Sequence, residues 1–145
     1  MTDEKFDKEK IIERIGDIKN AVLELKKFQK MSEEEFLSEI NNYNLTSYHL
    51  RIAIEAVLII GTHILSRIKQ NGKKKDYTQI ILSLADYKVL PTKFAQKIKG
   101  MAGYRNRLVH LYWKIDPREV FAIIKDELED FNDFIKYIKV FTELY

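Results

Sequence analysis

Apolar residues recur every three or four positions through most of this chain, and this spacing restricts the folds open to it. Between Phe6 and Phe28, apolar residues recur at Ile11, Ile15, Ile18, Val22 and Leu25. This period places the side chains on one side of an α-helix, where they form a stripe that a neighbouring element must cover. Among 145 residues there are five glycines and two prolines, so few positions interrupt a helix. No segment shows the alternation of a strand, and the sequence predicts an all-α protein.

Helix start and stop signals divide the chain into four main helices with one or two short additional helices, packed as an antiparallel bundle. Ser32–Glu35 and Asp76–Gln79 have the spacing of capping boxes, and Asp116 followed by Pro117 is a strong helix start. Asn71–Gly72 is a stop signal for the central helix. The predicted segments are 6–28, a short helix with Phe36, Leu37 and Ile40, about 45–70, about 76–89, about 92–109, and 117 nearly to 145.

Two glycines, Gly100 and Gly103, lie inside the helix predicted from Thr92 to Val109. Each costs about 1 kcal/mol relative to alanine in a helix interior. We therefore expect another helix, or the backbone of a ligand, to approach closely there. This helix and the central helix are the candidates for a dimer interface.

The length and composition indicate one domain, residues 1–145, of a size that buries its own core. There are no cysteines, which excludes disulfides and thiolate metal sites. The net charge of +3 and the pI near 8.9 permit contact with nucleic acid without requiring it. The charged first ten residues do not resemble a signal peptide. The longest apolar run, IAIEAVLIIGTHIL, looks too short to span a bilayer, so we expect a cytoplasmic protein that uses no membrane.

Polar and aromatic residues crowd into one segment, YRNRLVHLYW, from Tyr104 to Trp113. Cleavage of RNA by its own 2′-hydroxyl requires proton transfer to and from oxygen atoms and stabilisation of charge on the phosphorane. His110 has a side chain that titrates near neutral pH and can move those protons. Arg105 offers a planar set of donors to phosphate oxygens, and Asn106 can orient the phosphate or the imidazole. The chain shows no convincing carboxylate–histidine cluster, so this chemistry is expected to need no metal and no cofactor.

The spacing of Arg105 and His110 sets a geometric condition on this site. On an ideal helix, side chains five positions apart point about 140° away from each other. The two groups converge within one chain if the helix ends or distorts near His110, as the helix start at Asp116 suggests. In a symmetric dimer, a twofold axis can instead bring both copies of the segment into one cleft. Tyr112 would share a face with Arg105 if the helix continued.

Structural roles without catalysis remain open for the same residues. Arg105 and Arg107 could be solvated while His110 caps a carbonyl at the end of its helix. Glu55 and His63, eight apart on the central helix, could support the site, contact a second subunit or form a satisfied buried polar pair. Further open alternatives concern Arg51 and Arg67, which either widen a cationic cleft or are solvated.

The segment RNRLVHLY, Arg105 to Tyr112, resembles the arginine–asparagine, three-residue, histidine–x–tyrosine motif of the HepT-like branch of HEPN domains. LRIAIEAVLIIGTHIL upstream and KIKGMAGYRNRLVHLYWKID around the motif are also similar to that branch, so the resemblance covers nearly the whole chain. Arg107 departs from the aliphatic residue expected at its position. It is either a further phosphate contact or a surface charge.

The resemblance implies more than composition does. Similar HEPN domains are helical homodimers in which two motifs line one positively charged cleft, and many are metal-independent endoribonucleases. HepT-like members are typically the toxin of a toxin–antitoxin pair, whose antitoxin is a minimal nucleotidyltransferase that binds the toxin and attaches AMP to the motif tyrosine. The resemblance thus assigns catalysis to Arg105 and His110, support to Asn106 and Arg107, and AMPylation to Tyr112.

Two other functions remain as alternatives. A non-catalytic HEPN adaptor would dock the nucleotidyltransferase or RNA without cleaving anything, although the intact motif argues against it. A simple helical oligomerisation domain would explain the apolar stripes but not the polar residues around His110. The first hypothesis remains the RNA-cleaving toxin.

Overall fold

The computed structural model describes residues 5–68 and 76–144, apart from the side chain of Tyr112. No strand occurs in this part of the chain, which confirms the all-α prediction. The predicted helix end at Asn71–Gly72 lies outside it. The elements are α1 (Lys8–Gln29), α2 (Glu33–Leu37), α3 (Ile40–Ile68), α4 (Tyr77–Asp86), α5 (Thr92–Ile98), α6 (Gly100–His110), the 3-10 turn η1 (Tyr112–Lys114), α7 (Pro117–Asp126) and α8 (Glu129–Thr142).

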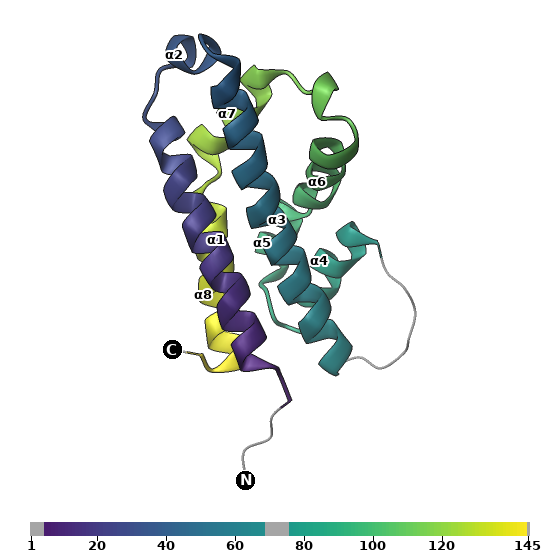
Figure 1. Ribbon diagram of the computed structural model, residues 1–145. Coiled ribbons are helices and arrows are strands. Elements are labelled where there is room, and N and C mark those ends of the chain that lie inside the picture. Colours follow the sequence, from purple (N-terminus) through teal and green to yellow (C-terminus); the bar gives the residue numbers. More distant parts are fainter. Residues whose placement is uncertain (1–4, 69–75, 145) are drawn as a thin grey trace.

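Helix α3 is the centre of the bundle. It contacts α1 along most of its length, and it also packs against α2, α4, α6, α7 and α8. In Figure 1, α1 lies beside α3 on one flank, while α4 and α6 lie on the other. The α3 side chains that are almost fully buried include Leu50, Ala53, Val57, Ile60 and Ile64. The apolar stripe predicted for α1, from Ile11 to Leu25, is buried as well.

Helix α3 begins at Ile40, earlier than the start near residue 45 that the sequence predicts. It is 29 residues long, with a mean hydropathy of 1.4 in its most apolar stretch, and by length and composition it could cross a membrane. The apolar run IAIEAVLIIGTHIL is only part of this helix, which begins at Ile40, well before the run. Within that stretch, 61% is buried inside the protein, as in the core helix of a bundle.

The helix starts follow the capping signals. Ser32 and Glu35 form a reciprocal capping box at α2, and Asp76 and Gln79 form another at α4. Asp116 caps α7 by accepting a hydrogen bond from the backbone N–H of Arg118, with proline in the first turn. Since α6 ends at His110, the expectation that this histidine lies at a helix end is confirmed.

Two helices predicted as continuous are each divided. The segment from Thr92 breaks at Lys99 into α5 and α6, so that Gly100 begins a helix and does not lie within one. The segment from Pro117 breaks at Glu127, where α7 ends and α8 soon follows. Both breaks let consecutive short helices turn their apolar sides to the same core.

Carboxylates cluster around the break at Glu127. A continuous helix would place Asp126 four residues from Asp130, and like charges at that spacing destabilise a helix. Asp130 is instead buried and paired with Lys97, whose Nζ lies 2.9 Å from Oδ1. Burial raises the pKa of the Glu127 carboxyl, and Asp130 and Asp126 raise it further. The apolar pattern runs across these residues without interruption and so gave no sign of the break.

The close helix approach occurs at a different glycine from the ones expected. A Cβ on Gly100 or Gly103 would meet nothing within 4 Å, so no helix packs closely on the side to which a Cβ would point. A Cβ on Gly61 of α3 would lie 3.1 Å from Ile80 and 3.1 Å from Leu84. Gly61 therefore sets the distance between α3 and α4.

We expect Gly61→Val to lower the free energy of unfolding by about 1–3 kcal/mol, because it overpacks the contact with α4. Gly16→Ala is the matched control, since Gly16 is helical and a Cβ there meets nothing within 4 Å. That control should gain up to about 1 kcal/mol from helix propensity. Urea denaturation followed by circular dichroism measures both. Equal stability of Gly61→Val and the parent would contradict the packing.

Candidate active site

Arg105 is held against the central helix. Its Nη2 lies 3.3 Å from Oε1 of Glu55 on α3, and that same carboxylate oxygen accepts a hydrogen bond from Arg51 at 3.2 Å. The guanidinium also lies over the ring of Tyr77 on α4, 5.2 Å from its centroid. The side chain of Arg105 is 20% exposed. Three elements thus fix its direction.

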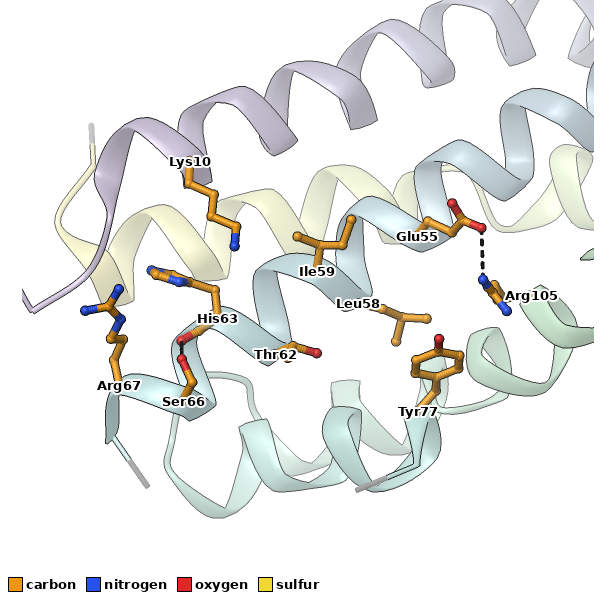
Figure 2. A pocket seen from close by; sticks show the side chains of 10 residues that line it. All are labelled: Lys10, Glu55, Leu58, Ile59, Thr62, His63, Ser66, Arg67, Tyr77 and Arg105. Carbon is orange, nitrogen blue, oxygen red and sulfur yellow. Dashed lines mark hydrogen bonds and ion pairs between the residues drawn. The ribbon is translucent and has the colours of Figure 1, made fainter. Parts of the chain in front are cut away.

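Arg105 opens onto a groove of about 640 Å³. Residues from α1, α3, α4 and α6 line this groove, and Figure 2 shows Arg105 with Glu55 at one end and His63 near the other. Leu58, Ile59 and Thr62 of α3 lie between them. A groove beside Arg105 is therefore present in a single copy, whereas the cleft that the resemblance implies is lined by the motifs of two copies.

Asn106 and Arg107 have different environments. Nη1 of Arg105 lies 3.3 Å from Oδ1 of Asn106, so Asn106 contacts the guanidinium directly. Arg107 points elsewhere and forms two hydrogen bonds to Glu119 of α7, at 2.7 and 3.1 Å. Its guanidinium also lies over the ring of Tyr104. Arg107 therefore links α6 to α7. The two alternatives predicted for it, a phosphate contact or a surface charge, did not include this structural role.

His110 does not line the groove that Arg105 enters. It is the exposed last residue of α6. Within the described part of the chain, no hydrogen bond or ion pair joins its side chain to Arg105 or to a carbonyl at the helix end. The structure gives no support to the carbonyl-cap reading, and one copy alone does not bring the two predicted catalytic groups together.

His63 and Glu55 line the same groove without pairing with each other. The backbone N–H of Asp7 donates to Nε2 of His63 at 3.0 Å and so fastens the start of α1 to α3. Burial lowers the pKa of His63, and the charges of Arg67 and Lys10 lower it further. His63 is a buried neutral acceptor, whereas Glu55 is a partly exposed anion between two arginines.

Sequence reasoning missed two aromatic neighbours. Tyr77 stacks against Arg105 although 28 positions separate them, and its place after the N-cap Asp76 gave no hint of this contact. Tyr104 has a buried hydroxyl that forms no hydrogen bond, and burial strongly raises its pKa. Tyr104 is therefore a core residue beside the site. No group of three potential metal ligands occurs among residues 5–68 and 76–144.

The environment of His63 makes stability depend on pH. Its pKa is lower in the folded protein than its ordinary value of 6.5, so the unfolded chain binds more protons near that pH. The free energy of unfolding should therefore fall as pH drops below about 6.5. His63→Gln, which keeps an acceptor for the Asp7 N–H, should lose this part of the pH dependence. Urea denaturation from pH 5 to 8 checks it; an unchanged slope in the variant would contradict the assignment.

Comparison with known proteins places these features in a family. The family model described as "Ribonuclease HepT-like" matches residues 18–138. A tRNA nuclease HepT of Aphanizomenon flos-aquae is 34% identical over 114 residues, which cover 79% of this chain and 77% of that protein. An mRNA nuclease HepT of Shewanella oneidensis is 28% identical over 131 residues, covering 89% of this chain and 96% of the relative.

A solved structure shares the fold over almost the full length. It is described as a tri-AMPylated Shewanella oneidensis HEPN toxin in complex with MNT antitoxin. The toxin is 26% identical, with a TM-score of 0.80, and the match covers 97% of this chain and 99% of that one. The family model spans Glu55 and the whole segment from Arg105 to Tyr112. By the extent of that match and the identity to the curated relatives, the chain belongs to the HepT-like ribonuclease family.

Proposed function

We propose that this protein is the endoribonuclease toxin of a toxin–antitoxin pair, and that it cleaves RNA at a composite site between two copies. One observation carries the proposal: Arg105, in the family segment, is anchored by Glu55 and Tyr77 at the mouth of an open groove. The curated relatives, a tRNA nuclease and an mRNA nuclease, support RNA as the substrate class. RNA and an antitoxin are available in the cytoplasm, which is the proposed location.

The reaction is a transesterification. The 2′-oxygen forms a bond to the adjacent phosphorus, the bond from phosphorus to the 5′-oxygen breaks, and the 2′-proton leaves while the 5′-oxygen gains one. His110, exposed at the end of α6, performs the proton transfers. Arg105 has five N–H donors, and its contacts with Glu55 and Asn106, at 3.3 Å each, leave others for phosphate oxygens. No metal takes part in this proposed scheme.

The proposal uses two copies because, in one copy, His110 neither lines the groove nor forms a hydrogen bond with Arg105 among the described residues. Apolar side chains next to His110 favour association: Val109 is 36% exposed, Leu111 41% and Trp113 66%. A homodimer that covers them would bring a second α6 against the first and so place the His110 of each copy near the groove of the other.

We expect Arg105→Ala and His110→Ala each to reduce the cleavage rate by about 10²–10⁴-fold, the range for losing a proton-transfer or charge-stabilising group. His110 is exposed, so the fold of its variant should be intact by circular dichroism. His49→Ala, which changes another histidine of the chain, should cleave like the parent. The rate is measured on fluorescent RNA with and without EDTA and should not depend on EDTA. Parent-like cleavage by His110→Ala would contradict the proposal.

The partner we propose is a minimal nucleotidyltransferase antitoxin that binds the toxin and AMPylates Tyr112. The related Shewanella toxin is AMPylated and in complex with MNT antitoxin, which supports this reading. Tyr112 is in η1, directly after the end of α6. AMP on its hydroxyl would bring a negative charge and a bulky base beside the site where RNA phosphate is to bind. The modification would therefore block RNA sterically and weaken the attraction to it.

Intact-mass spectrometry of the protein coexpressed with its nucleotidyltransferase should show one or more added AMP units. Tyr112→Phe should abolish the added mass. Tyr104→Phe is the matched control and should keep it, because the Tyr104 hydroxyl is buried and out of reach of an enzyme. If the Tyr112→Phe variant kept the added AMP mass, another residue would be the site of modification.

One observation favours the alternative of a non-catalytic adaptor. Arg105 is paired with a carboxylate and has no contact with His110 in a single copy. An adaptor would bind RNA or the nucleotidyltransferase with this groove and leave RNA uncut. Binding and cleavage measured on one preparation separate the two functions, since the adaptor predicts the first without the second.

A further inference from the structure

The groove continues well past Arg105, and its far end contains two cations that the proposed chemistry does not use. Lys10 near the start of α1 and Arg67 near the end of α3 line the same groove as Arg105. Figure 2 shows Lys10 and Arg67 on either side of His63, at the end away from Arg105. Neither forms an ion pair with a carboxylate of the described residues. These charges are free to meet an anion.

The two cations are held in place by the fold. The hydrogen bond from the Asp7 N–H to His63 fixes the first turn of α1 on α3, three residues before Lys10. The charges of Lys10 and Arg67 both lower the pKa of His63, so both lie near its imidazole. Since His63 is buried and neutral, it adds no charge that would cancel theirs.

The length of the groove matches a strand of several nucleotides. Glu55, which holds Arg105, and Arg67 are 12 positions apart on α3, or about 18 Å at the rise of an α-helix. Ile59, 38% exposed, and Thr62 lie between the two ends. A positively charged groove that follows the backbone is a feature by which proteins bind single-stranded nucleic acid.

We propose that this groove binds the RNA strand on one side of the scissile phosphate, and that Lys10 and Arg67 hold a phosphate several nucleotides from the cut. This proposal rests on the proposed ribonuclease function and extends it to a second phosphate subsite. Lys10 and Arg67 bring two positive charges into the groove that no carboxylate of the described residues pairs with. A polyanion is therefore the occupant that the charges favour.

The test compares Lys10→Ala/Arg67→Ala with the control Lys26→Ala/Lys93→Ala. The control removes the same charge from exposed positions that do not line this groove. Binding is measured in the full-length protein with 2′-O-methyl RNA, which cannot be cleaved by transesterification, as a dinucleotide and as a strand of about 12 nucleotides. Cleavage of unmodified RNA is measured on the same preparations, and light scattering gives their oligomeric state.

Each lost contact with a single-strand phosphate reduces the slope of log K against log salt by about 0.7, or roughly fivefold in affinity at 0.1 M salt. Because the proposed subsite holds one phosphate, the groove variant should bind the long strand about fivefold more weakly, with a slope smaller by about 0.7. The loss should be smaller with the dinucleotide, which cannot reach both ends. The control variant should bind the long strand like the parent.

Equal binding by the two variants, or an equal loss with both RNA lengths, would overturn the subsite. A groove variant that becomes monomeric while the control does not would also overturn it, and would make the groove an interface between copies. If the expected binding loss appears but the parent leaves unmodified RNA uncut, the groove assignment stands and the ribonuclease function fails.

Discussion

The burial of α3 is the constraint on which the rest of the structure depends. This helix packs against six others, and side chains such as Leu50, Ile60 and Ile64 are at most 1% exposed. Each contributes about 1.5–3 kcal/mol by leaving water. The ion pair between Glu55 and Arg105 is partly exposed, and such pairs contribute at most about 1 kcal/mol. Apolar burial therefore determines the fold, and the ion pair determines where Arg105 points.

A buried helix with one accessible strip explains how a small bundle can carry a site. The strip of α3 that faces the groove holds Glu55, Ile59, Thr62 and Arg67, while the other sides of the helix form the core. Helix α6 supplies Arg105 to this strip, and α1 supplies Lys10. The proposed chemistry and the proposed RNA path thus share one rigid element, although their residues come from distant parts of the sequence.

Local rules predicted much of the fold. The caps at Ser32, Asp76 and Asp116 depend on residues a few positions apart, and all three are confirmed. The break at Glu127 and the close approach at Gly61 depend on which helices pack together, which one apolar pattern does not reveal. An apolar run also cannot show where a helix begins, which is why the length of α3 was underestimated.

The sequence likewise predicted one part of the candidate site, whereas the other part required the tertiary structure. The segment containing Arg105 and His110 could be located by its resemblance to a family motif. Contacts that direct its side chains, such as Arg107 with Glu119 and Arg105 with Tyr77, join residues 12 and 28 positions apart and require the tertiary structure. The roles of Arg105, His110, Asn106 and Tyr112 stay predictions.

The central claim is that Arg105 of one copy acts with His110 of another, and mixing inactive subunits tests it most directly. Arg105→Ala and His110→Ala proteins are unfolded together, refolded as a mixture, and assayed for RNA cleavage beside each variant alone. A mixed dimer contains one intact Arg105 facing one intact His110 across the interface, so the account predicts that cleavage returns. A mixture as inactive as its components would show that both groups must come from the same copy, and the composite site would be wrong.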